Sequence, residues 1–280
     1  MKRYFSLFLL VALACGCNDS EGDNPAGTGS ETQQPVSSDE ILPRRLVSVN
    51  VTPIDDSSYS DAFSYDEQGR LVSITDTYSD SGYEDTFRYT YTDNTIVAGS
   101  EWTYRLQNDR VVMARLDEEW SDYWAEMMFN YDAAGYVASL AITGDEGFKS
   151  DCAMTYTADG VSVRSRGDEW DSTLSIKFDR ERLNTLNLDF YGAFCEGLED
   201  LAGEYSQTLL LGVGGQRLRY LPATATVVSY YKEDGQWYTG KYVSRYVYHM
   251  DGDYLSEVEI YTDEGEGESK EPARIVFHYE

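Results

Sequence analysis

The sequence predicts an all-β fold in which an antiparallel meander of hairpins forms a large curved sheet or a barrel. Two observations carry this prediction. Short segments rich in aromatic and β-branched residues recur about every dozen residues, and turn-forming residues separate them. Within segments such as 85–91, aromatic residues alternate with Thr and Arg, so one face is buried and the other is solvated.

The strands expected along the chain are 45–52, 59–65, 70–78, 83–91, 100–106, 110–117, 125–131, 136–142, 151–157, 160–166, 171–178, 183–190, 223–232, 236–248, 254–262 and 272–279. They lie in a region of even composition without an interior linker, so residues 41–280 are expected to form one β domain. About 240 residues is an ordinary size for a single sandwich or barrel.

The clearest hairpin spans residues 63–74. Its turn contains Asp66, whose side chain can bond the following backbone, and Gly69, which adopts positive φ without steric cost. Related segments begin at Tyr89, Phe129, Met154, Ile176 and Tyr248. A single hairpin cannot bury its own apolar face, so several must lie side by side. The motif Tyr-Asp-x-x-Gly-Arg-Leu at 65–71 resembles the tyrosine–aspartate (YD) repeat, which implies the winding β-sheets of bacterial surface and toxin-shell proteins.

Residues 1–17 are expected to be a secretion signal. Lys2 and Arg3 precede a short apolar core, which ends at Leu13-Ala-Cys-Gly-Cys17. This ending resembles the lipobox of bacterial lipoproteins, where the Cys is acylated and becomes the new N-terminus. Cys17 is the expected lipid attachment site, because the acidic run that follows resembles the surface-export signal of Bacteroidetes lipoproteins. Cys15 is the alternative, and a plain cleaved signal peptide remains open.

Residues 18–40 contain Gly, Ser, Thr, Asn, Pro, Gln and acids, with little to bury, and are expected to be a disordered tether. The meander is interrupted at 192–222. Phe194, Leu198 and Leu201 have the spacing of an amphipathic helix, and the Leu-rich segment after them is expected to plug or cap the sheet.

This layout resembles a family of Bacteroidetes lipoproteins of unknown function. The resemblance rests on the lipobox, the polar tether, the YD-like hairpins and a Leu-Gly…Leu-Pro segment before the last strands. It covers residues 41–280 and implies a porin-like fold, meaning a curved or closed many-stranded sheet. It also implies a lipid anchor at the outer membrane, and it assigns no functional residue.

The chain has 22 basic and 50 acidic residues, a net charge of −28, which disfavours nucleic acids and anionic glycans. Most of this charge is expected on a solvated surface. Calcium binding at the acidic segments 251–253 or 263–268 is a weaker alternative, because neither has the ligand spacing of a known calcium loop. No other cofactor is expected. The domain itself is not expected to span a membrane, because its polar strand faces contradict an outward apolar band.

Cys152 and Cys195 are the cysteines within the domain, and either a disulfide or two buried thiols fits them. His249 and His278 lie in expected strands without the spacing of a zinc motif, so no metal site is predicted.

The chain has 24 Tyr and 5 Trp, most of which are expected in the core and in cross-strand pairs. Trp120 and Trp124 lie in a polar segment between expected strands, and Trp170 and Trp237 have similar settings. Exposed rings of this kind can form a platform for a sugar face. These four residues are therefore the candidate ligand platform, and packing of the rings onto the sheet is the alternative.

Three functions fit the sequence. The first is a surface or periplasm-facing binding protein, with a glycan as candidate ligand, which exposed tryptophans would favour. The second is a structural lipoprotein that binds another outer-membrane protein and no small ligand, which a flat exposed face would favour. The third is a hydrolase, which would need two facing carboxylates in a deep cleft. No catalytic motif supports an enzyme, so a non-enzymatic function is predicted.

Overall fold

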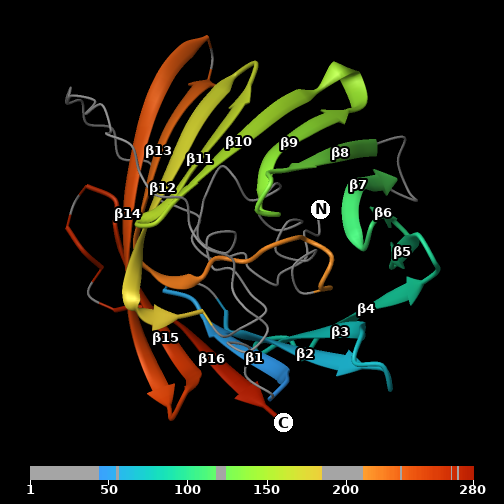
Figure 1. Ribbon diagram of the computed structural model, residues 1–280. Coiled ribbons are helices and arrows are strands. Elements are labelled where there is room, and N and C mark those ends of the chain that lie inside the picture. The colour runs from blue at the N-terminus through green and yellow to red at the C-terminus, as the bar shows by residue number, and fades with distance from the viewer. Residues whose placement is uncertain are drawn as a thin grey trace.

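The computed structural model describes residues 44–54, 57–117, 124–184, 211–233, 235–265, 267–269 and 271–280. They form a closed antiparallel barrel of 16 strands, and each strand pairs with its neighbours in the chain. Figure 1 shows the strands arranged in a ring that runs from β1, in blue, to β16, in red.

The strands are β1 Leu46–Thr52, β2 Tyr59–Tyr65, β3 Leu71–Tyr78, β4 Glu84–Tyr91, β5 Thr95–Ala98, β6 Trp102–Gln107, β7 Arg110–Asp117, β8 Trp124–Tyr131, β9 Val137–Gly144, β10 Lys149–Thr157, β11 Gly160–Gly167, β12 Trp170–Leu183, β13 Tyr220–Glu233, β14 Gln236–Asp251, β15 Tyr254–Asp263 and β16 Ala273–Tyr279. A single 3-10 turn, η3 at Asp145–Gly147, separates β9 from β10.

The predicted all-β antiparallel meander is confirmed, and of its two forms the barrel is the observed one. Closure comes from pairing of the first strand with the last, for example Val49 with Phe277 and Val51 with Ile275. Most expected strands match the observed ones within a few residues. The exceptions are β5, which was not predicted, and the expected strand 183–190, which lies outside the described residues except for its first two positions.

The apolar side chains that alternate along the strands form one core inside the barrel. In β11, Val161 and Val163 are buried while Arg164 and Arg166 are exposed. Every strand contributes at least one side chain to the same cluster, so the buried face is the inner face. Each large apolar side chain removed from water stabilises the fold by about 1.5–3 kcal/mol.

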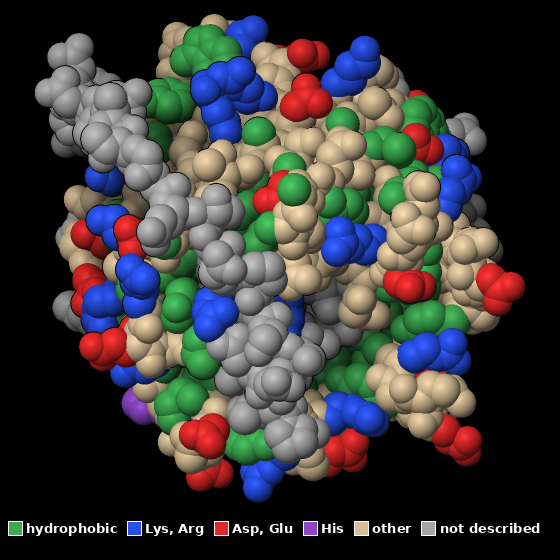
Figure 2. All heavy atoms as spheres, in the orientation of Figure 1, with side chains coloured by type: hydrophobic (Ala, Val, Ile, Leu, Met, Phe, Trp, Pro, Cys, Tyr) green, Lys and Arg blue, Asp and Glu red, His purple; other side chains and the backbone are tan. Residues whose placement is uncertain are grey.

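The outer wall of the barrel carries charged pairs along its strands. Arg164 contacts Asp171 at 2.6 Å, and Arg115 lies 3.7 Å from Glu126. In Figure 2, Lys and Arg side chains are interspersed with Asp and Glu around the periphery of the barrel. Within the described ranges, no helix is long and apolar enough to cross a membrane.

The Asp–Gly turns of two hairpins share one geometry. Asp66 accepts hydrogen bonds from the backbone N–H groups of Gln68 and Arg70, and Asp132 accepts one from the N–H of Tyr136. Desolvation opposes ionisation of Asp66, but the backbone and side-chain hydrogen bonds from Arg70 outweigh it and lower the pKa of that carboxyl. Gly69 at φ +80° completes the first turn with a conformation that L-residues rarely adopt.

A tyrosine at the end of an even-numbered strand repeatedly donates its hydroxyl hydrogen bond to a carbonyl at the start of the preceding strand. We call this arrangement the tyrosine clasp. It joins Tyr65 to Leu46, Tyr91 to Leu71, Tyr131 to Val111, Tyr248 to Pro222 and Tyr279 to Leu255, at 2.6–2.8 Å. Burial raises the pKa of Tyr65 and of Tyr91 to about 12, although a nearby arginine opposes the shift, so both phenols stay protonated donors.

All five clasps have the same offset from the end of the strand ladder. The β3–β4 ladder stops at Ser73 and Arg88, and the clasp forms two residues before Ser73 and three after Arg88. The other four pairs of strands repeat these offsets. Each clasp therefore joins two strands just beyond their last backbone pair, where the ladder no longer holds them together.

In three clasps, the residue before the acceptor is an arginine that covers the tyrosine ring. The guanidinium carbon lies 4.7 Å from the Tyr65 centroid for Arg45, and 4.7 Å from the Tyr91 centroid for Arg70. Arg110 covers the Tyr131 ring at 5.4 Å. A cation over an aromatic face is attracted by about 0.5–1 kcal/mol where it is exposed to solvent.

The segment that precedes β13 binds the same end of the barrel. The N–H of Val111 donates to the carbonyl of Val213, and the N–H of Gln216 donates to the carbonyl of Gly135. Leu218 is buried at 1% exposure and belongs to the core cluster, and the plug expected at 192–222 stays a prediction. The helix expected at 192–202 lies outside the described residues.

Replacing Tyr131 by Phe removes the clasp hydroxyl and leaves the buried carbonyl of Val111 without its donor. We expect the free energy of unfolding to fall by about 1–2 kcal/mol. Tyr230→Phe is the matched control, because Tyr230 is 49% exposed on β13 and should change stability by less than about 0.5 kcal/mol. Chemical denaturation of both variants measures the difference, and equal effects would contradict a stabilising role for the clasp.

Candidate functional site

The two ends of the barrel differ in composition. One end carries the Asp–Gly turns and the tyrosine clasps. At the other, the odd-numbered strands end and the even-numbered strands begin, and Trp124, Trp170 and Trp237 all lie there, within the first two residues of β8, β12 and β14. The structure thus brings three of the four predicted platform tryptophans to one end. Trp120 lies outside the described residues.

Trp170 lies on the inner face at the start of β12. Its ring stacks on Phe148 with centroids 5.5 Å apart and an interplanar angle of 23°. It also lies over Gly167 of the neighbouring strand, where a Cβ atom would approach the indole to 2.3 Å. The glycine therefore provides the room that lets Trp170 reach across β11 to Phe148.

Two tyrosines form a second stack on the next two strands. Trp170 is paired with Tyr231 of β13, and Tyr231 is paired with Tyr238 of β14. The two tyrosine rings stack at 5.7 Å with an interplanar angle of 23°. We call Phe148, Trp170, Tyr231 and Tyr238 the aromatic row. With strands about 4.8 Å apart, the row from β10 to β14 spans roughly 19 Å.

The aromatic row is accessible to solvent. Phe148 is 39% exposed and Tyr231 is 36% exposed, whereas large aromatic side chains in the core are below 9%. Its two tyrosines lie on a projecting hairpin, because β15 ends at Asp263, opposite Val243, and residues 236–242 of β14 continue past it. Figure 1 shows β13 and β14 as the long ribbons at one side of the barrel.

The other predicted tryptophans face away from the row. Trp237 is 57% exposed near the tip of the β13–β14 hairpin, on the face opposite to Tyr238. Trp124 is the first residue of β8, on the outer wall, where the guanidinium of Arg115 lies 5.2 Å from the ring. Among the described residues the platform is therefore centred on Trp170. The sequence analysis missed Phe148, Tyr231 and Tyr238. The consecutive expected strands 223–232 and 236–248, which pair as neighbours, were the available signal for the two tyrosines.

A second unusual feature at this end is a buried pair of acids. Asp61 of β2 is paired with Asp76 of β3, and Asp76 is paired with the exposed Asp85 of β4. Asp61 is fully buried and Asp76 is 4% exposed. Among the described residues no N–H or hydroxyl group donates to either oxygen of Asp61.

Both carboxyl groups of this pair have raised pKa values, so they hold protons more readily than ordinary aspartates. Burial, then the charge of Asp76 and a hydrogen bond with it, raise the pKa of Asp61 well above its usual range. The pKa of Asp76 is raised to about 6. Burial is the largest cause, the hydrogen bond with Asp61 opposes it, and the charge of Asp85 adds to it. When Asp61 is protonated, its carboxyl can donate to Asp76, which suits this buried pair better than two adjacent carboxylates would.

The other sites predicted from the sequence are the cysteines and the acidic segments. Cys152 is buried, and burial raises the pKa of its thiol to about 12, so the thiol is unreactive. Its expected partner Cys195, like the lipid-site candidates Cys15 and Cys17, lies outside the described residues. In the acidic segment 263–268, Asp263 accepts backbone hydrogen bonds from Gly265 and Gly267, and Glu268 makes a bidentate pair with Arg245. These oxygens already have partners, and calcium binding there stays an untested expectation.

The described residues form a closed antiparallel barrel with a hydrophobic interior, a charged outer wall and a partly exposed row of aromatic rings at one end. No protein-family model matches the chain, and no curated protein matches it significantly. Two solved structures share the fold. A porin-like protein from Bacteroides uniformis has a TM-score of 0.64 and 13% identity, over 86% of this chain and 99% of its own. A porin-like protein from Bacteroides vulgatus has a TM-score of 0.55 and 14% identity, over 84% and 98%.

The aspartate pair makes the stability of the barrel dependent on pH. Both folded-state pKa values lie above the unfolded value of about 3.9, so the folded state retains protons that the unfolded state has lost. The free energy of unfolding should therefore fall as pH rises from about 4 through the folded-state pKa of Asp76, about 6, and should go on falling until the pH passes the folded-state pKa of Asp61.

Asp61→Asn removes the buried ionisable group while its amide can still donate to Asp76. We expect this variant to be about 1–3 kcal/mol more stable than the wild type at pH 7.5, with the gain shrinking at pH 4. Asp85→Asn, at the exposed third position, should give a smaller gain, because it removes only the charge that raises the pKa of Asp76. Denaturation at both pH values measures this, and a gain for Asp61→Asn that does not depend on pH would refute the assignment.

Proposed function

We propose that this protein is a lipid-anchored outer-membrane protein, facing the cell surface, that binds a neutral glycan with the aromatic row. The observation that carries the proposal is the aromatic row, in which Phe148 stacks on Trp170 and Tyr231 stacks on Tyr238, with the two tyrosines on a projecting hairpin. Flat rings offer apolar surface to the C–H faces of sugars, and nearby polar groups bond their hydroxyls.

The net charge of the protein favours a neutral ligand over an anionic one. The net charge of −28 disfavours anionic polysaccharides and nucleic acids, because the field of the protein repels them. The hairpin itself carries Lys232 and Lys241, so the local surface is more balanced than the whole. A neutral glycan has no charge to be repelled and can use both the rings and the polar edge.

The barrel is proposed to stand in water, attached to the membrane through an acylated Cys17 and the tether 18–40. Its outer wall carries ion pairs such as Arg164 with Asp171 and Arg115 with Glu126, at strand positions where a membrane barrel needs an apolar band. A single acyl chain binds membranes marginally, whereas two or more give stable anchoring. The resemblance of the two porin-like structures supports the barrel fold, and the anchor is inferred from the sequence.

Affinity electrophoresis against a panel of neutral and anionic polysaccharides tests the ligand class. The wild type, expressed from residue 18, should be retarded by a neutral glycan. Tyr238→Ala and Trp170→Ala should each bind at least tenfold more weakly, because a ring at the centre of a binding site contributes about 2 kcal/mol. Trp124→Ala, on the outer wall, is the control and should bind normally.

Melting temperatures separate lost binding from lost folding, and Tyr238→Ala is the more informative variant because its ring is on a projecting hairpin. Equal binding by wild type and both row variants would refute the site. Failure of every neutral glycan to retard the protein, with crosslinking on cells to one outer-membrane protein, would favour the partner-binding alternative.

Cys17→Ser should abolish metabolic incorporation of labelled palmitate and release the protein from the membrane fraction into the soluble fraction. Cys15→Ser is the matched control and should remain labelled. Labelling that survives in Cys17→Ser and disappears in Cys15→Ser would move the attachment site, and labelling of neither wild type nor variants would refute the anchor.

A further inference from the structure

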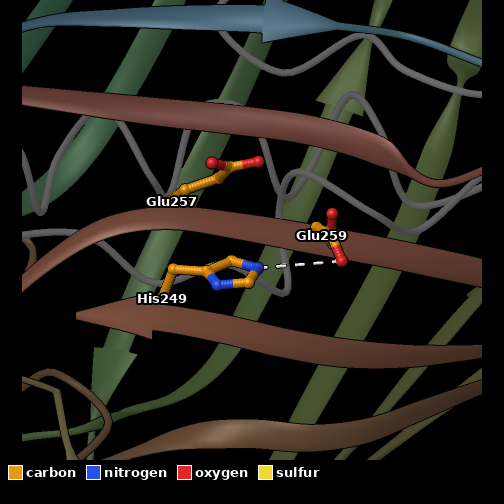
Figure 3. Close-up of side chains that lie close together, drawn as sticks. All are labelled: His249, Glu257 and Glu259. Atoms are coloured by element: carbon orange, nitrogen blue, oxygen red, sulfur yellow. Dashed lines mark ion pairs between the residues drawn. The ribbon is translucent and has the colours of Figure 1, made fainter.

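Three potential metal ligands lie together on the outer wall, formed by strands β14 and β15. His249 is paired with Glu257, and Glu259 lies two residues further along the same face of β15. One ligand atom from each of the three lies within 4.8 Å of the others. Figure 3 shows the imidazole directed along the strands towards the Glu259 carboxylate, with the Glu257 carboxylate above it.

The distances suit a single small ion. His249 Nε2 and Glu259 Oε2 are 3.7 Å apart. Bonds of about 2.0–2.1 Å in tetrahedral geometry put two ligand atoms about 3.4 Å apart, so these two need to move only slightly. The Glu257 side chain is half-buried and the His249 side chain is exposed, so both the ion and a fourth, solvent ligand have access.

The neighbouring groups hold the glutamates without occupying all their oxygens. Tyr261 donates its hydroxyl hydrogen bond to Glu259 Oε2 at 3.1 Å. Arg274 contacts the Oε1 atoms of both glutamates, at 3.2 Å for Glu259 and 3.9 Å for Glu257. Arg274 therefore competes with a bound cation for the same carboxylates, but its side chain is 52% exposed and can turn towards solvent.

We propose that His249, Glu257 and Glu259 form a binding site for a divalent transition-metal ion of the zinc type. An imidazole with two carboxylates is a ligand set typical of zinc and its neighbours, whereas calcium takes oxygen ligands alone. Three protein ligands leave one coordination position for water. The net charge of −28 raises the local concentration of cations and favours occupancy.

This site is separate from the glycan site. His249 lies eleven residues beyond Tyr238 on β14 and faces outward, while Tyr238 faces inward. Loss of metal binding should therefore leave glycan binding unchanged.

The chain has only two histidines, which gives a matched control. His278 lies on β16 with its Nε2 atom 3.1 Å from the side-chain nitrogen of Asn50, outside the cluster. Untagged, chelator-treated mature chain should bind one Co²⁺ with visible d–d absorption and release it to Zn²⁺. His249→Ala should weaken binding at least a hundredfold, and His278→Ala should bind like the wild type.

Two further variants test the ligands and the competitor. Glu259→Gln should weaken binding at least tenfold, and Arg274→Gln should bind more tightly than the wild type because it removes the competing cation. Circular dichroism checks that each variant is folded. Equal Co²⁺ binding by wild type and His249→Ala would overturn the proposal. An absence of binding in the wild type at millimolar Co²⁺ and Zn²⁺ would do so as well, and would leave the cluster as an ion-pair network.

Discussion

The barrel depends on the tyrosine clasp, because the clasps hold strand ends that the backbone ladder has left. Tyr91 donates to the carbonyl of Leu71 at 2.7 Å, beyond the last β3–β4 backbone pair, and four other pairs of strands repeat the contact at the same offsets. The clasp also accounts for the residues of the motif at 65–71. The tyrosine donates and the aspartate forms the turn. Gly69 leaves room for Arg45, since a Cβ atom would approach its guanidinium to 3.1 Å. The arginine of the same motif covers the next tyrosine, and the leucine carbonyl accepts its hydroxyl.

The clasps lie at one end of the barrel, so the residues at the opposite end are not needed for this contact. There the longest strands project, the aromatic row is exposed, and Asp61 with Asp76 introduces a buried ionisable pair. Such a pair costs stability at neutral pH, which a barrel clasped at its other end can tolerate. Sites of binding commonly lie on segments that a rigid scaffold positions, and here the scaffold is the clasped wall.

Local patterns in the sequence predicted the strands well, because alternation and turn residues act over a few positions. β5 was missed since its four residues, 95–98, are too short to show alternation. Closure could not be predicted, because pairing of Val49 with Phe277 joins opposite ends of the chain. Trp170 was among the four tryptophans singled out in the sequence, but the row also needed the cross-strand pairing of Tyr231 with Tyr238. The aspartate pair and the cluster at His249 likewise become visible only once the register is known.

Hydrogen exchange on a variant with Tyr91→Phe, Tyr131→Phe and Tyr279→Phe tests most directly whether the clasps hold the barrel. If they do, amide protection should fall first at the clasped ends of β3, β7 and β15, which carry the three acceptor carbonyls. Protection of β13 and β14 near the aromatic row should stay as in the wild type, since their own clasp is intact. Unchanged protection at the clasped ends, or a uniform loss throughout the barrel, would contradict the account.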